Sequence, residues 1–118
     1  MMGKSAQKVD LAEAAKSWID AHYAEKFSLE VLARELFINK SYLLRVFKKK
    51  MGETPLYYHN HRRCETAQAL LKRAELSIAF VGREVGFISA SHFTRVFKSM
   101  CGCTPSEFRR ETNKRNGK

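Results

Sequence analysis

The chain has 118 residues, of which 44% are hydrophobic, an ordinary fraction for a globular protein. This length suits one compact domain or two very small ones. No apolar run approaches the roughly 20 residues that a transmembrane helix needs, and no charged-then-apolar leader is present. The sequence therefore predicts a cytoplasmic protein with no membrane contact.

The formal net charge of +10 is distributed unevenly along the chain. Residues 1–36 hold five lysines and arginines against six acidic residues, whereas residues 37–118 hold 17 against six. Solubility alone needs no such segregation. A basic excess confined to one part of a chain indicates a surface for a polyanionic partner.

The three cysteines, Cys64, Cys101 and Cys103, have no disulfide-framework spacing and predict reduced thiols. His59 and His61 with Cys64 come closest to a ligand cluster, but they lack the two-pair spacing of structural zinc sites. We expect no metal and no cofactor. The chain also lacks a Ser-His-Asp context, a glycine-rich phosphate loop and paired carboxylates in an apolar setting, so we expect no enzyme.

Residues 1–9 are small and polar, and we expect them to be disordered. From residue 10 onward, a side chain that can cap a helix precedes each segment with helical apolar periodicity. The expected helices are 10–24, 29–36, 40–50, 55–72, one from 78 to a stop at Gly86, 89–100 and one from Pro105, with caps at Asp10, Ser28, Asn39, Thr54, Ser77, Ser89 and Thr104.

Three features of these helices carry specific expectations. Trp18 is the only tryptophan and should anchor the core. The helix from Pro55 is roughly 27 Å long at 1.5 Å per residue, and we expect it to be a stiff spacer with Arg62 and Arg63 on its surface. Gly82 lies in mid-helix, where glycine costs about 1 kcal/mol relative to alanine, so it should permit a close helix approach.

The stretch Ser89–Met100 forms a two-faced helix. Phe93, Val96, Phe97 and Met100 make an apolar stripe, while the opposite face carries hydroxyls and cations and no acid. Such a face suits the DNA major groove, where base edges and phosphates accept hydrogen bonds. The plain alternative is a solvated surface helix.

This stretch has a counterpart 50 residues earlier. The Ser, Arg, Val, Phe and Lys of 41–48 recur in 91–98, and Gly52, Thr54 and Pro55 recur as Gly102, Thr104 and Pro105. Before the turn the offset is 49, so one residue is inserted near Ile88. Two copies of a short helix, a tight turn and a cationic helix indicate a duplicated helix-turn-helix module.

The segments 78–87, 91–98 and 102–109, with their Gly-Phe, Phe-x-Arg-x-Phe-Lys and Thr-Pro blocks, resemble the signature of the AraC/XylS family of bacterial transcription regulators. The resemblance covers about residues 10–110. It implies an all-α, seven-helix DNA-binding domain with two homeodomain-like three-helix subdomains, 10–52 and 77–110, joined by a linker helix over 55–73 and followed by a basic tail over 111–118. The third and sixth helices would enter successive major-groove segments, about 34 Å apart.

The family motif also implies roles for individual side chains. Arg45 and Arg95 would bind guanine through the guanidinium fork, and Leu44 and Ala90 would touch thymine methyl groups. The full set of expected base contacts is Lys40, Ser41, Leu44, Arg45, Ala90, Ser91, His92, Thr94 and Arg95. The expected phosphate contacts, which set affinity without sequence, are Ser28, Lys48, Lys49, Ser77 and Lys98.

Two departures from the family pattern affect these expectations. Phe37 stands where the family usually has glycine, so the first turn is expected to be strained or differently shaped. Ile88 and Ala90 replace residues that are usually polar, so the second helix offers fewer hydrogen-bond donors to the bases.

We therefore predict a sequence-specific regulator, an activator that also touches RNA polymerase and binds a bipartite site as a monomer at the nucleoid. The alternative is a basic helical module that binds an acidic partner protein. Most family members carry an additional sensing or dimerisation domain, and the sequence leaves open whether this chain is a stand-alone regulator or a fragment. The sequence also does not identify the operator or an effector.

Overall fold

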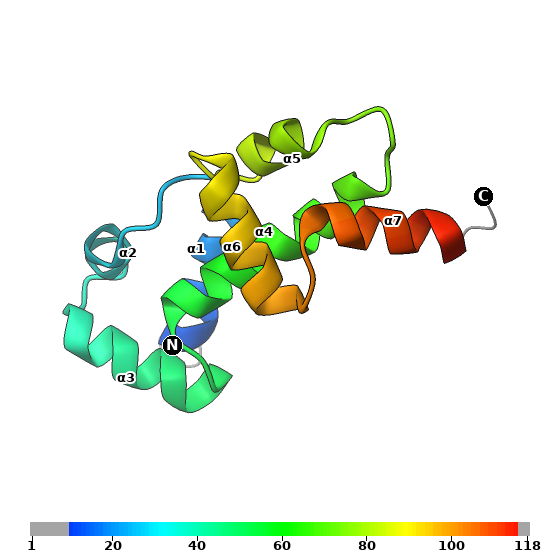
Figure 1. Ribbon diagram of the computed structural model, residues 1–118. Coiled ribbons are helices and arrows are strands. Elements are labelled where there is room, and N and C mark those ends of the chain that lie inside the picture. Colours follow the sequence, from blue (N-terminus) through cyan, green and yellow to red (C-terminus); the bar gives the residue numbers. More distant parts are fainter. Residues whose placement is uncertain (1–9, 116–118) are drawn as a thin grey trace, which may run out of the picture. The chain divides into compact units, whose positions relative to one another are not determined.

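The computed structural model describes residues 10–115 of the chain, and these residues form helices and no strands (Figure 1). The seven helices are α1 Leu11–His22, α2 Leu29–Glu35, α3 Lys40–Met51, α4 Pro55–Leu71, α5 Ile78–Glu84, α6 Ala90–Cys101 and α7 Pro105–Arg115. The all-α, seven-helix expectation is thus confirmed for the described residues. None of these helices has the length and apolarity to cross a membrane.

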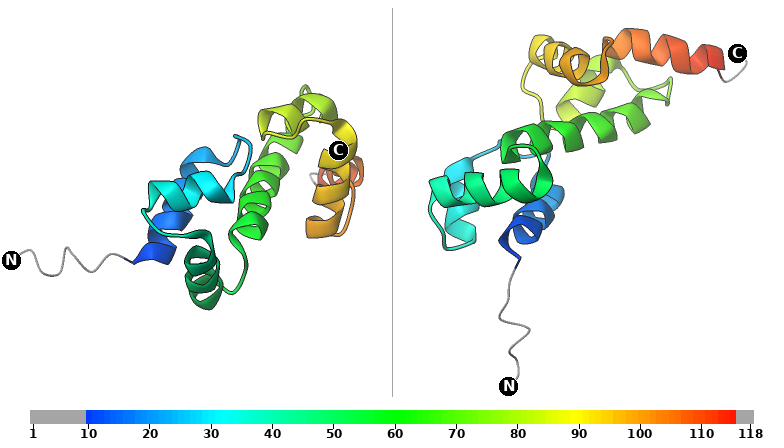
Figure 2. Two further views of the ribbon diagram at one scale, coloured as in Figure 1. Left: turned by 90° about the vertical axis from the view of Figure 1, so that its left-hand side faces the viewer. Right: turned by 90° about the horizontal axis from the view of Figure 1, so that it is seen from below.

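The described residues divide into two compact units. The first contains those up to His22 together with Phe27–His59, and the second contains Tyr23–Lys26 together with those from Asn60 onward. The boundary falls within α4, which gives its first turn to the first unit and the rest to the second. In each unit a short helix leads through a tight turn into a longer one, α2 into α3 and α5 into α6 (Figure 2).

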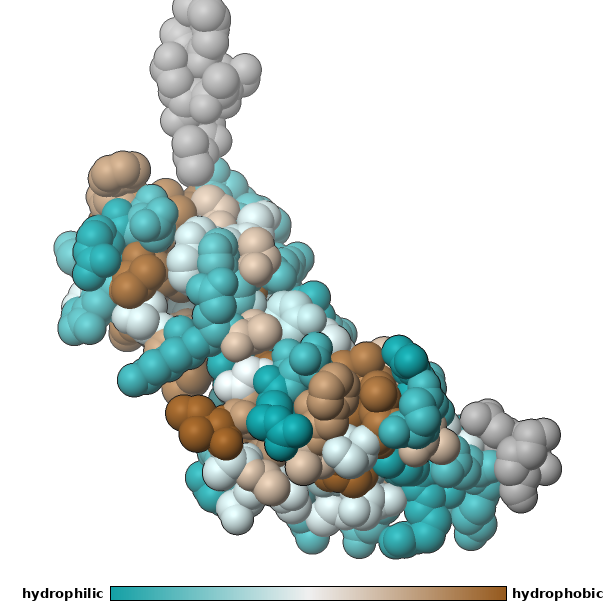
Figure 3. Space-filling model, turned by 90° about the horizontal axis from the view of Figure 1, so that it is seen from above, coloured by the Kyte–Doolittle hydropathy of each residue, from teal (hydrophilic) through white to brown (hydrophobic). Residues whose placement is uncertain are grey.

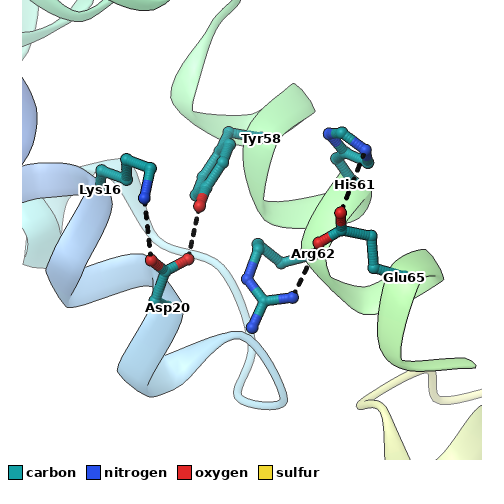
Figure 4. Close-up of polar contacts among 6 residues, drawn as sticks. All are labelled: Lys16, Asp20, Tyr58, His61, Arg62 and Glu65. Carbon is teal, nitrogen blue, oxygen red and sulfur yellow. Dashed lines mark hydrogen bonds and ion pairs between the residues drawn. The ribbon is translucent and has the colours of Figure 1, made fainter. Parts of the chain in front are cut away.

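The core of the first unit lies where α3 packs against α1 and α2. It is built from Ala15, Ile19, Leu32, Ala33, Leu43 and Phe47. Trp18 packs at its edge, half-buried, with its ring stacked 3.8 Å from that of His22, so this tryptophan borders the core rather than filling it. In the same unit the Tyr58 hydroxyl donates to Asp20, which also pairs with Lys16 (Figure 4).

The core of the second unit is centred on α6, which packs against α5 and α7. Phe87, Phe93, Phe97 and Phe108 form a continuous run of rings, with neighbouring centroids 5.3 to 5.8 Å apart. A Cβ atom on Gly82 would lie 2.7 Å from the Phe93 ring, so α5 and α6 are as close as the sequence predicted.

The helix caps confirm the expected starts. Side-chain oxygens of Ser28, Asn39, Ser77 and Ser89 accept the backbone N–H three residues on, at 2.8 to 3.1 Å. Thr104 and Glu107 form a reciprocal capping box. Among the described residues, three glycines have positive φ angles. Gly52 ends α3, Gly102 ends α6, and Gly86 lies in the turn that follows α5.

Three expectations about the helices need correction. Arg63 is buried instead of exposed, because its guanidinium donates to the carbonyls of Tyr23 and Glu25, 2.7 Å from each. The linker helix ends at Leu71 rather than at residue 73. Helix α7 continues to Arg115, so the expected boundary at residue 110 falls inside it. Basic residues in its last turn interact favourably with the negative end of the helix dipole. Residues 1–9 and 116–118 lie outside the described part of the chain.

Candidate nucleic-acid interface

Helix α3 presents one cationic face because its apolar residues fix its rotation. Asn39 caps its start, and Leu43 and Phe47 are completely buried against the first unit's core. The side chains on the opposite side are exposed. This basic face of α3 comprises all the residues that the sequence assigned to it: Lys40, Ser41, Leu44, Arg45, Lys48 and Lys49.

Helix α6 repeats this arrangement in the second unit. Ser89 caps its start, and Phe93 and Phe97 are completely buried. The basic face of α6 comprises Ala90, Ser91, His92, Thr94, Arg95 and Lys98. All of these are exposed except Thr94, which is half-buried and so offers less of its side chain to a ligand than the sequence predicted.

The charge on both faces is of one sign, since neither α3 nor α6 contains an acidic residue. Within residues 10–115, Lys48, Lys49 and Lys98 form no ion pair and are available to an anion. Lys40 differs, because its Nζ lies 3.1 Å from a carboxylate oxygen of Glu30. An anionic ligand of Lys40 must therefore compete with Glu30, and breaking such an exposed ion pair costs little free energy.

Lys50, next to the basic face of α3, is also engaged. Its Nζ lies 2.6 Å from Asp10, the side chain that caps α1. The hydrogen bond to this carboxylate raises the pKa of Lys50, and the hydrogen bond from Lys50 lowers the pKa of Asp10. The pair connects the start of α1 to the end of α3 within the first unit.

The two serines expected at phosphates, Ser28 and Ser77, serve as the caps of α2 and α5. Each hydroxyl oxygen accepts a backbone N–H, at 3.1 Å in Ser28 and 3.0 Å in Ser77. The hydroxyl proton is still available to donate, and the first turn of a helix favours an anion. Both residues thus keep the chemistry that a phosphate contact requires.

The turns before α3 and α6 each expose a large apolar side chain. Phe37 is 93% exposed and Ile88 is 90% exposed. Phe37 has a φ angle of +59°, and the corresponding Gly86 has +103°, so Phe37 adopts the left-handed conformation that this turn requires. The backbone strain that was expected because Phe37 stands in place of a glycine is therefore present. On the face shown in Figure 3 the apolar side chains form separate spots among hydrophilic ones.

Sequence reasoning overlooked two residues next to the basic face of α3. The Arg45 guanidinium lies over the Tyr42 ring, 5.2 Å from its centroid, and Glu30 pairs with Lys40. The three-residue spacing of Tyr42 and Arg45 on a helix would have signalled the first contact. Nothing in the local sequence signals the second, because Glu30 and Lys40 lie on different helices.

The described residues contain no group of three histidines, cysteines or acids that could hold a metal. His59, one of the histidines considered above, is buried with its ring edge-on to Phe27. Burial raises the pKa of the Cys64 thiol to about 12, so it is neutral at physiological pH. What these surfaces offer chemically is cationic and hydrogen-bonding contact.

Comparison with known families and proteins agrees with this geometry. The helix-turn-helix domain family matches residues 32–111. The helix-turn-helix transcriptional regulator YijO of Escherichia coli K12 is 35% identical over 86% of this chain and 36% of its own length. The arabinose operon regulatory protein of the same organism is 35% identical over 80% of this chain and 33% of its own. The transcriptional activator RhaS of Escherichia fergusonii is 31% identical over 79% and 34%. This chain thus spans about a third of the length of these relatives.

Two solved structures are similar over nearly all of their own length. The C-terminal domain of AraT, a response regulator from Geobacillus stearothermophilus, superposes with a TM-score of 0.83 at 27% identity, covering 89% of this chain and 88% of that one. The DNA-binding domain of AdpA, a global transcriptional factor solved in complex with a target DNA, gives 0.84 at 25% identity, with 93% and 99% covered.

Proposed function

The chain belongs to the AraC family of helix-turn-helix transcription regulators, and on this premise we propose that it reads two adjacent major-groove segments of double-stranded DNA, one with α3 and one with α6. The family is one of DNA-binding domains rather than enzymes. The observation that carries the proposal is the repeated basic face, in which buried phenylalanines orient a helix without acids so that its cations and hydroxyls face outward.

The exposed side chains divide into two roles by their chemistry. Arg45 and Arg95 have the planar, five-donor group that binds the two acceptors of guanine, and Lys40, Ser41 and Ser91 can donate to base edges. Leu44 and Ala90 offer carbon to a thymine methyl group. Lys48, Lys49 and Lys98, together with the cap hydroxyls of Ser28 and Ser77, would bind phosphates and determine affinity.

The wider role of the protein is part of the same proposal. The likeness to the transcriptional activator RhaS supports activation. An activator would have RNA polymerase as a second partner. Two dissimilar basic faces on one chain suit an asymmetric bipartite site, with half-sites about one helical turn apart, that a monomer can occupy. Such a protein would work in the bacterial cytoplasm, at the nucleoid, and would need no enzymatic activity.

The test is selection of binding sites from random duplex DNA by the full chain, at two salt concentrations. We expect two enriched half-sites about one helical turn apart. Arg45→Ala should relax the preference in one half-site and Arg95→Ala in the other, each by about 1–3 kcal/mol at a single base pair. The two variants are matched controls for one another because each leaves the other basic face intact.

One result would favour the alternative function. If no sequence is enriched and the weak binding vanishes with modest salt, the contacts to DNA are only electrostatic. The basic faces would then be better explained by an acidic partner protein.

A further inference from the structure

The contact between Tyr42 and Arg45 has no counterpart in the second unit. Both residues lie on α3, three positions apart and therefore on neighbouring parts of the helix surface. The Cζ atom of Arg45 lies 5.2 Å from the centroid of the Tyr42 ring, within the range of a cation–π interaction. Arg45 forms no ion pair or hydrogen bond with the described residues, so this ring is the contact that restrains its guanidinium.

The equivalent pair on α6 is arranged differently. His92 takes the place of Tyr42 and Arg95 takes the place of Arg45, but the His92 ring is edge-on to Phe87, with centroids 5.3 Å apart. Phe87 is a buried ring of the second unit's core. His92 is thus engaged by Phe87, and Arg95 has no contact of this kind with any described aromatic ring.

Restraint of an arginine before binding has a physical consequence. An exposed arginine has several rotatable bonds, and fixing them on binding costs free energy that a pre-oriented side chain does not lose. The planar guanidinium can also stack on a ring while its N–H groups stay free at the edge to donate. A ring that holds Arg45 can therefore orient the fork without using its donors.

We propose that Tyr42 is a positioning residue that pre-orients the Arg45 guanidinium for guanine, so that α3 discriminates its base pair more sharply than α6 does. The inference rests on the proposed function, since it assigns a base contact to Arg45. The face of the Tyr42 ring positions Arg45, and the phenolic hydroxyl has no part in this role.

The geometry is tested first in the free protein, without DNA. In NMR spectra, the side-chain protons of Arg45 should be shifted upfield by the ring current of Tyr42, and those of Arg95 should lie at ordinary values. Tyr42→Leu should abolish the shift and Tyr42→Phe should keep it. Ordinary values for Arg45 in the wild-type protein would overturn the inference whatever the protein binds.

The effect on recognition is tested with the selected DNA duplex and a duplex in which the guanine read by Arg45 is replaced by adenine. The measured quantity is the ratio of the two dissociation constants. Tyr42→Leu should reduce this ratio about two- to fivefold, and Tyr42→Phe should restore it. Tyr57→Leu removes another exposed tyrosine, one that lies outside α3, and should leave the ratio unchanged.

The two possible failures are distinguishable. If Arg45→Ala lowers the ratio and Tyr42→Leu weakens both duplexes equally, the base contact stands and the positioning role is wrong. If Arg45→Ala itself leaves the ratio unchanged, the assignment of Arg45 as a base contact fails, and the positioning role fails with it.

Discussion

Phe37 is a residue whose backbone conformation opposes its side chain. A φ angle of +59° places its Cβ close to the following carbonyl, which costs about 1–2 kcal/mol for a residue other than glycine. Its side chain is almost fully exposed and returns little burial energy. The sequence already pointed to this position, because Phe37 stands where the family usually has glycine.

Phe37→Gly should therefore stabilise the protein. We expect a gain of about 0.5–1 kcal/mol, since relief of the strain exceeds the extra chain entropy of glycine in the unfolded state. Urea unfolding followed by circular dichroism measures it. Phe37→Ala is the matched control, because alanine removes the ring but keeps the Cβ atom. An equal gain from alanine would show that the ring, and not the backbone, is the source of the strain.

Arg63 shows what a single residue can hide from sequence reasoning. Its position on α4 suggested an exposed cation, but in the structure it binds two carbonyls and lies over the Phe87 ring, 5.0 Å from its centroid. Burial lowers the pKa of its guanidinium. These partners are distant in sequence, so no local pattern could announce them.

At the scale of elements, the close approach of α5 and α6 depends on Gly82. Gly82→Ala would place a methyl group 2.7 Å from the ring of Phe93, which is completely buried. The resulting overpacking typically costs 1–3 kcal/mol, and the better helix propensity of alanine offsets about 1 kcal/mol of it. We expect a net loss of up to about 2 kcal/mol in the free energy of unfolding, measured by urea unfolding.

The matched control for Gly82 lies in the same helix. Ala79 is exposed on α5, so Ala79→Gly should cost about 1 kcal/mol through propensity alone. The measured loss gives the stabilisation that the Gly82→Ala variant gains from the better helix propensity of alanine. Stabilisation by Gly82→Ala would contradict the requirement for close packing.

The elements were largely predictable because their signals are local. A capping side chain, an apolar period and a glycine in the left-handed region each act within a few residues, and all four Ser and Asn caps form as expected. The predicted end of α7 was wrong because a run of charged residues is compatible with both a tail and an exposed helix. The partners of Lys40 and Arg63 come from other segments of the chain, and only the fold brings them together.

At the scale of the whole molecule, the net charge of +10 favours a polyanionic partner. Each lysine that neutralises a phosphate releases counterions, so DNA affinity should fall as the salt concentration rises. Lys48→Gln, Lys49→Gln and Lys98→Gln should each reduce the slope of log K against log salt by about 0.9, with the preferred DNA sequence unchanged. Titrations of the selected duplex at several salt concentrations measure the slope. Lys26→Gln, an exposed lysine between α1 and α2, is the control. A changed sequence preference would assign that lysine to the bases instead.

A duplicated module is ordinarily expected to be separable into its copies, but this chain is not built that way. The residues that join α1 to α2, Tyr23–Lys26, belong to the second unit, where Arg63 binds the carbonyls of Tyr23 and Glu25. A fragment carrying only the second copy would leave a buried guanidinium without its acceptors, which proteins tolerate poorly. Cutting the chain between the two copies should therefore destabilise the second one, although the sequence repeat alone suggests two independent modules.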